Sequence, residues 1–220
     1  MTSEGGDPPP EGWPKQQRGY GLAYRFLSRS FYQPPTLSWM LALVDERLFE
    51  AWPVPVTPET TPGLTLLREY CEGWEPSGLQ ELEWDFNRLF VGPGKMLAPP
   101  WESVHRSSDG LTFQRCTLEV PGVYKEFGLQ APELHREPDD HLALELAFVA
   151  HLSELAVSAA EQGDQALVDR CFGAQRRFLE DHVMAWMPAC LALVNEHAET
   201  DYFLGLAGLT LGTLEGSSGP

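Results

Sequence analysis

Residues 133–141 read E-L-H-R-E-P-D-D-H, and a long run with helical periodicity follows them directly. Pro138 suits the first turn of a helix, where its missing N–H costs nothing. Asp139 and Asp140 in the same turn would lie near the positive end of the helix macrodipole. This stretch therefore predicts that a helix begins at Pro138. Its four carboxylates and two imidazoles could in addition form a metal, catalytic or recognition site.

Helical periodicity recurs along the chain. The helix from Pro138 is expected to reach about Gln162, with apolar residues three or four positions apart along one face. The same spacing predicts further helices at residues 19–33, 36–48, 64–72, 77–90, 117–127, 164–183, 187–197 and 202–214. Alternating strand patterns are nearly absent, and β-branched residues are few. The sequence therefore predicts an all-α protein.

Composition limits the possible partners. The 220 residues carry a formal net charge of -17, from 15 basic and 32 acidic side chains. Such a surface repels nucleic acid phosphates and attracts basic peptides. The four cysteines, at positions 71, 116, 171 and 190, form no C-x-x-C pair, and no secretion signal or membrane-spanning run is evident. We expect reduced thiols in the cytoplasm, a disordered leader over residues 1–14 and a frayed tail over residues 215–220.

An irregular loop with apolar side chains is expected at residues 91–104, which read V-G-P-G-K-M-L-A-P-P-W-E-S-V. Its glycines and prolines exclude a regular element. Connecting loops are usually short and polar, so an apolar one indicates a specific role. Trp101 could either fill the core, as tryptophan often does, or form part of a binding surface.

Metal and catalytic chemistry have weak support. Glu137 and His141 lie four residues apart, as do His141 and Glu145, which would place each pair on one helical face. A di-metal bundle requires a second Glu-x-x-His on another helix, and the chain has none. No nucleophile motif or phosphate-binding loop is present either. The alternative that remains is a small helical metallohydrolase using Glu137, His141 and His182.

A binding protein accounts for more of the sequence. The acidic surface, the apolar loop and the charged hinge at residues 133–141 would all suit a partner that is both basic and apolar. A peptide with arginines followed by an apolar stretch is such a partner. Its arginines would pair with carboxylates, and its apolar part would lie along helix faces.

Several motifs resemble those of the TorD/DmsD/NarJ-like redox-enzyme maturation chaperones. Glu133, Glu137-Pro138 and Asp140-His141 reproduce the family's E-x-x-x-E-P-x-D-H signature. Further similar segments occur in the family's order at residues 86–93 (F-N-R-L-F-V-G-P), 98–104 (A-P-P-W-E-S-V), 178–188 (F-L-E-D-H-V-M-A-W-M-P) and 201–214. The similarity covers roughly residues 20 to 214, and the A-P-P-W loop favours the TorD/DmsD side.

The resemblance implies a single all-α domain over residues 15–214, with about 8–12 helices. Its N-terminal half would end near residue 130, and a hinge loop at 131–141 would lead into the C-terminal half at 142–214. It implies a cytoplasmic chaperone without catalytic activity or cofactor. Such a chaperone binds the twin-arginine signal peptide of an apo molybdopterin oxidoreductase, of DMSO or TMAO reductase type, and delays its export until the cofactor is inserted. Monomer and dimer both stay open, as does nucleotide binding.

The resemblance also implies a set of site residues. The signal-peptide-binding residues would be Phe86, Leu89, Phe90, Pro100, Trp101, Asp140 and His141. Asp140 is expected to meet arginine, and Trp101 and Phe90 the apolar part of the peptide. Glu133, Glu137 and Pro138 would fix the hinge loop. Glu102 and His105 stand where the family often has glycine and an aromatic residue, and they are expected to alter the rim of the groove.

Overall fold

The computed structural model describes residues 12–106, 115–129 and 138–217, without the side chains of residues 115–118. Within these ranges the chain forms helices and no strand, which confirms the all-α prediction. The α-helices are α1 (Trp13–Tyr32), α2 (Leu37–Asp45), α3 (Thr61–Gly73), α4 (Leu79–Phe86), α5 (Glu102–Arg106), α6 (Arg115–Glu126), α7 (Leu142–Glu161), α8 (Gln165–Phe178), α9 (Met184–His197) and α10 (Asp201–Ser217). Short 3-10 turns η1 (Leu48–Glu50) and η2 (Pro76–Gly78) and π turns η3 (Asn87–Val91) and η4 (Leu179–Val183) extend or connect them.

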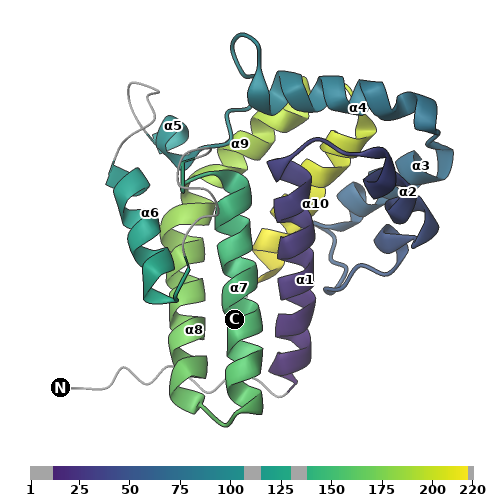
Figure 1. Ribbon diagram of the computed structural model, residues 1–220. Helices are drawn as coiled ribbons and strands as arrows, with labels where there is room; N and C mark the ends of the chain where they lie inside the picture. The colour runs from purple at the N-terminus through teal and green to yellow at the C-terminus, as the bar shows by residue number, and fades with distance from the viewer. Residues whose placement is uncertain (1–11, 107–114, 130–137, 218–220) are drawn as a thin grey trace.

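Helix α7 forms the centre of the fold. It packs along α1 on one side and α8 on the other, and α10 packs against α3 and α9. Figure 1 shows α1, α7 and α8 side by side, with α2, α3 and α4 gathered at one end of the molecule. By length and composition α7 could cross a membrane, but 72% of its apolar window is buried within the protein. Its hydrophobicity is therefore that of a core helix, because it has neighbours on most of its faces.

The predicted start of α7 at Pro138 is wrong. The helix begins at Leu142, and His141 is its N-cap residue with extended backbone angles (φ -75°, ψ 136°). The imidazole Nδ1 of His141 accepts a hydrogen bond from the N–H of Ala143 at 3.1 Å. Pro138 and Asp140 thus precede the helix instead of forming its first turn. Pairing of His141 with another segment of the chain holds this backbone extended, and that tertiary contact outweighs the local preference of proline for a helix start.

Other boundaries shift for similar reasons. Helix α1 already begins at Trp13, so Trp13 and Pro14 do not belong to a disordered leader. Helix α10 continues to Ser217, because the hydroxyl of Tyr20 donates to the carbonyl oxygen of Gly216 at 2.8 Å and fixes the last turn. Residues 1–11 and 218–220 lie outside the described residues. Helix α9 begins at Met184 instead of Met187, since it follows η4 without a break.

Two predicted helix caps are confirmed. Thr36 accepts a hydrogen bond from the N–H of Trp39 at the start of α2, at 3.2 Å. Asp164 accepts one from the N–H of Leu167 at the start of α8, at 3.0 Å. In both cases a side-chain oxygen pairs with one of the N–H groups that the first turn leaves free.

Helices α3 and α10 approach closely where Gly63 faces Gly205. A Cβ atom at Gly63 would lie 2.4 Å from the backbone nitrogen of Leu209 and 2.7 Å from the carbonyl oxygen of Gly205. Backbone atoms cannot move aside as the end of a side chain can. Glycine at this position therefore sets the distance between the two helices.

We predict that Gly63→Ala lowers the free energy of unfolding by about 1–3 kcal/mol, as overpacking of a core typically does. Gly73→Ala, in the same helix, is the matched control, because no atom lies within 4 Å of its added Cβ. Its stability should stay unchanged or rise by up to about 1 kcal/mol from the gain in helix propensity. Urea unfolding measures both, and equal effects of the two substitutions would contradict the close contact.

Candidate functional site

A short backbone bridge joins the apolar loop to the hinge. The N–H of Leu142 donates to the carbonyl oxygen of Pro100 at 2.8 Å, and the N–H of Glu102 donates to that of Asp140 at 3.0 Å. These two bonds pair Trp101 with His141 as an isolated antiparallel bridge. The carboxylate of Asp140 adds a third bond, accepting from the N–H of Ser103 at 2.8 Å. Two predicted motifs about 40 residues apart, A-P-P-W and E-P-D-D-H, are thus in direct contact.

The imidazole of His141 lies between two aromatic rings. Trp101 and Tyr32 each meet it edge to face, with ring centroids 5.9 Å away. His141 is only 5% exposed, and burial lowers its pKa to about 4. The ring is therefore neutral at physiological pH, and its Nδ1 accepts the hydrogen bond from Ala143. His141 acts here as a fixed apolar and hydrogen-bonding element and carries no charge.

A buried charged group lies directly behind the bridge. Glu102 is fully buried, and its carboxylate contacts His182 Nδ1 at 3.0 Å and Arg106 Nη1 at 2.5 Å. Burial favours a raised pKa for Glu102, but the hydrogen bonds from His182 and Arg106 outweigh burial and lower it. The expectation that Glu102 alters the rim of a groove is wrong, because its side chain points into the protein. Through its contact with His182, Glu102 holds the start of α5 against η4.

Glu145, on the first turns of α7, is a second buried carboxyl group. It accepts a hydrogen bond from the indole N–H of Trp186 at 2.9 Å. Burial, followed by the negative charge of Glu102, raises the pKa of Glu145 well above its ordinary value. We infer that Glu145 is protonated and Glu102 ionised at neutral pH.

His105 is half-buried nearby, with its ring 5.2 Å from that of Trp186 and its Nε2 2.7 Å from the carbonyl oxygen of Pro99.

The predicted peptide-binding residues fall into two groups. Pro100, Trp101, Asp140 and His141 meet at the bridge, and among them only Trp101 is appreciably exposed. Phe86, Leu89 and Phe90 are buried in the core. Phe90 packs edge-on against Phe31, with ring centroids 5.7 Å apart. In this conformation these three side chains are part of the core and offer no surface to a peptide.

The hinge residues are only partly described. Glu133 and Glu137 lie outside the described residues. Pro138 accepts a hydrogen bond from the N–H of His141 at 3.1 Å, which closes a turn before α7. A structural role for Pro138 is thus compatible with its position.

Sequence reasoning missed Tyr32 and His182 as neighbours of the bridge, because their separation from it along the chain gives no local signal. It singled out Glu102 but placed it at the rim of a groove instead of in the interior. Glu145 did carry a signal, because a carboxyl group among the apolar residues of α7 requires a buried partner. Its partner, Trp186, lies in the segment 178–188 that the resemblance singled out.

The metallohydrolase alternative finds no support. Among the described residues, no group of three His, Cys, Asp or Glu side chains is placed to hold a metal ion. The Nδ1 atom of His182 already contacts the carboxylate of Glu102, and that of His141 already accepts a hydrogen bond from the N–H of Ala143. Glu137 lies outside the described residues.

An all-α fold in which the A-P-P-W loop contacts Asp140 and His141 agrees with the class that the motifs resemble, the helical redox-enzyme maturation proteins. The chain belongs to the nitrate reductase delta subunit family, whose sequence model matches residues 57–192. It is 27% identical over 202 residues to the Tat proofreading chaperone DmsD of Salmonella typhi, covering 90% of this chain and 89% of that protein. It is 24% identical over 196 residues to the probable Tat proofreading chaperone DmsD of Haemophilus influenzae, covering 87% and 86%.

A further sequence relative supports the same class, and a solved structure supports the fold. The chaperone protein TorD of Vibrio parahaemolyticus is 29% identical over 131 residues, and the match spans 60% of each chain. A solved structure from Archaeoglobus fulgidus, described as a redox enzyme maturation protein, shares the fold with a TM-score of 0.50 and 16% identity, over 87% of this chain and 92% of that one. The predicted class is therefore confirmed: the protein is a maturation chaperone and not an enzyme.

The two buried carboxyl groups should respond differently to removal of charge at pH 7. Glu102→Gln should lower the free energy of unfolding by about 1.5–3 kcal/mol, because it weakens hydrogen bonds to a charged group. Glu145→Gln should cost little, since a neutral amide replaces a neutral carboxylic acid and still accepts from Trp186. Urea unfolding of both variants checks this, and a larger loss for Glu145→Gln would show that the charges are assigned the wrong way round.

We predict a distinctive pH dependence for Glu145→Gln. The raised pKa lets the native carboxyl group keep its proton at pH values at which the unfolded one, with a pKa near 4.5, has lost it. The wild type therefore loses stability as pH rises, by up to about 1.4 kcal/mol per pH unit until the raised pKa is reached. The variant lacks this loss, so its stability relative to wild type should increase from pH 5 to pH 8. A difference that stays constant from pH 5 to pH 8 would contradict protonation of Glu145.

Proposed function

We propose that this chaperone binds the twin-arginine signal peptide of a molybdopterin-containing oxidoreductase in the cytoplasm. It would hold the apo enzyme, of DMSO or TMAO reductase type, back from export until its cofactor is inserted. Two relatives that cover most of the chain are named Tat proofreading chaperones. The net charge of -17 favours a basic peptide, since it raises the rate of encounter with cationic partners.

The observation that carries the proposal is the unused hydrogen-bonding capacity at the bridge. Asp140 Oδ1, Ser103 Oγ and Trp101 Nε1 are buried atoms without a partner among the described residues. Buried polar atoms are usually paired, so three such atoms at and beside the half-buried Trp101 mark a place for a polar ligand. A guanidinium group would supply donors to Asp140, and an adjacent apolar side chain would pack against Trp101.

Calorimetry with a peptide containing S-R-R-x-F-L-K and the following apolar run tests this function. We expect binding at micromolar protein that weakens as salt is added, because charge pairs near the surface are screened. Absence of binding to the wild type at this concentration would overturn the proposal.

Two substitutions test the placement of the site. Trp101→Ala should weaken peptide binding about 10- to 100-fold, as loss of an aromatic anchor typically does. Asp140→Asn should also weaken it, while its remaining carbonyl oxygen can still accept from Ser103 and so maintain the bridge. Leu22→Ala, at an exposed position on α1, is the control. Affinities equal to wild type in both site variants would show that the peptide binds elsewhere.

A further inference from the structure

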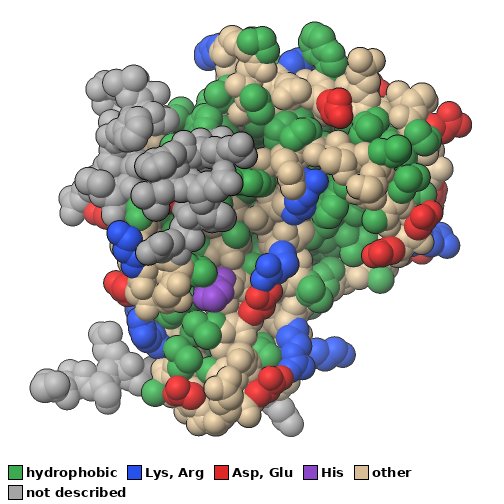
Figure 2. All heavy atoms as spheres, in the orientation of Figure 1, with side chains coloured by type: hydrophobic (Ala, Val, Ile, Leu, Met, Phe, Trp, Pro, Cys, Tyr) green, Lys and Arg blue, Asp and Glu red, His purple; other side chains and the backbone are tan. Residues whose placement is uncertain are grey.

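The outer face of α4 and η3 carries two large exposed hydrophobic side chains among polar ones. Trp84 is 66% exposed and Val91 is 53% exposed, the former more than any other large hydrophobic side chain among the described residues. They lie seven residues apart, Trp84 on α4 and Val91 at the end of the π turn η3 that continues it. Figure 2 shows a few hydrophobic side chains among polar and charged ones along the upper edge of the molecule, where α4 lies in Figure 1. Single exposed apolar residues are common, so the meaning of this face depends on its surroundings.

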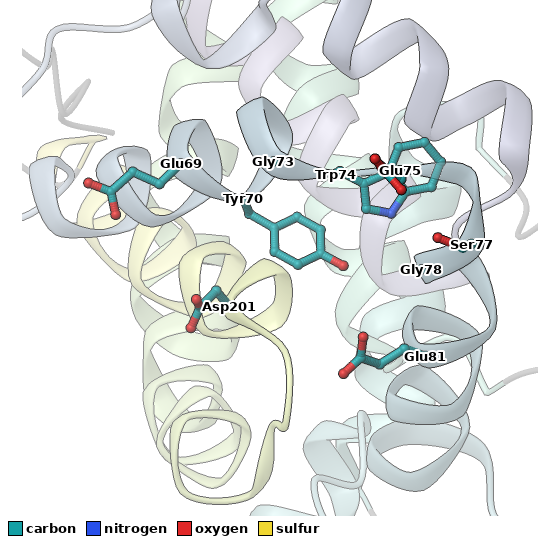
Figure 3. A pocket seen from close by; sticks show the side chains of 9 residues that line it. All are labelled: Glu69, Tyr70, Gly73, Trp74, Glu75, Ser77, Gly78, Glu81 and Asp201. Carbon is teal, nitrogen blue, oxygen red and sulfur yellow. The ribbon is translucent and has the colours of Figure 1, made fainter.

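A cavity of about 460 Å³ opens at the N-terminal end of this face. The end of α3, η2 and the first turns of α4 and α10 form its walls. Its lining includes two aromatic residues and four carboxylates: Tyr70, Trp74, Glu69, Glu75, Glu81 and Asp201. Figure 3 shows the ring of Tyr70 between the carboxylates of Asp201 and Glu81, with Trp74 and Glu75 further along the wall. No Lys, Arg or His belongs to this lining.

These walls favour an organic cation. A guanidinium or ammonium group is attracted by carboxylates and by the faces of aromatic rings. The four carboxylates are on exposed residues, so they are hydrated and ionised without a large cost. Trp74 Nε1 is a buried atom without a partner among the described residues. The stem of an arginine or lysine side chain could pack on the rings while its charged end meets the carboxylates.

The cavity and the outer face of α4 lead toward the loop that forms the bridge. Glu81, in the cavity wall, is three residues before Trp84, and such residues are neighbours on a helix surface. At the other end, the carbonyl oxygens of Arg88 and Leu89 accept from the N–H groups of Leu97 and Ala98, at 3.2 and 2.9 Å. The face therefore leads from the cavity to the loop that carries Trp101. At 1.5 Å per residue, Leu79 to Val91 spans roughly 20 Å, which about six extended peptide residues cover.

We propose that this surface, the cavity together with Trp84 and Val91, is a second docking site for the client polypeptide. Its occupant is a basic and apolar segment of the client, which places a cationic side chain in the cavity and apolar side chains over Trp84 and Val91. The inference rests on the proposed function, and it extends the peptide contact from the bridge along α4. Four carboxylates at its end disfavour anionic occupants such as nucleic acid or an anionic membrane.

Charge-neutralising variants test the surface with the S-R-R-x-F-L-K peptide used above. The double variant Glu75→Gln/Glu81→Gln and the single variant Trp84→Ala should each weaken binding about tenfold. Glu46→Gln/Glu59→Gln is the matched control, since it removes two exposed carboxylates that lie neither in the cavity lining nor on α4. All the replaced side chains are exposed, so the fold should survive. Binding equal to the control in both test variants would overturn the inference while leaving the proposed function intact.

A short probe separates the cavity from the rest of the peptide. The dipeptide N-acetyl-Arg-Arg-amide lacks the apolar run, and we expect it to shift the indole N–H resonance of Trp74 in an NMR titration, assigned with Trp74→Phe. The shift should disappear in Glu75→Gln/Glu81→Gln and persist in the control. If the dipeptide shifts Trp74 but the long peptide does not bind, the proposed function fails and the cavity stays a cation site. No shift at millimolar dipeptide would overturn the cavity's role.

Discussion

The pairing of Trp101 with His141 is the contact on which the rest of the structure depends. Two backbone hydrogen bonds and one from Ser103 to Asp140 join segments about 40 residues apart. Closing such a long loop is entropically costly, and the polar groups it buries must be paired. In the bridge, the N–H groups at the starts of α5 and α7 each pair with a carbonyl oxygen of the other segment. The bridge thereby fixes the direction in which the central helix leaves the hinge.

The buried charges behind the bridge make its geometry specific. An ionised Glu102 between His182 and Arg106, next to a protonated Glu145, tolerates few alternative arrangements. Buried ion pairs contribute little to stability when compared with a well-packed apolar core, because desolvation offsets their attraction. Removing one partner of such a pair nevertheless lowers the stability strongly, because it leaves a buried charge unpaired. The network therefore acts mainly by excluding other positions of the loop that carries Trp101, and it links that loop to η4 and α9.

Sequence patterns predicted the helices well where the local signal and the tertiary contacts agree. The caps at Thr36 and Asp164 and the apolar run of α7 are such cases. The prediction failed at Pro138, where proline and two acidic residues match a helix start but the bridge requires extended backbone. It was incomplete at Phe86, Leu89 and Phe90, whose spacing is that of any buried helical face. The contact between the two motifs could be inferred only through the family resemblance, since no local rule relates position 101 to position 141.

Charge and apolar contact have separate roles in recognition by such a surface. The acidic residues are unevenly placed, since α1 carries four basic residues (Lys15, Arg18, Arg25 and Arg29) and no acidic one. Exposed carboxylates act over a distance and mainly accelerate encounter, and salt weakens them. At the two proposed sites, aromatic residues such as Trp84 and Trp101 would act only in contact, and they would govern how long a partner stays. A chaperone must release its client, so affinity divided between many weak charges and a few aromatic side chains suits it better than one deep apolar groove would.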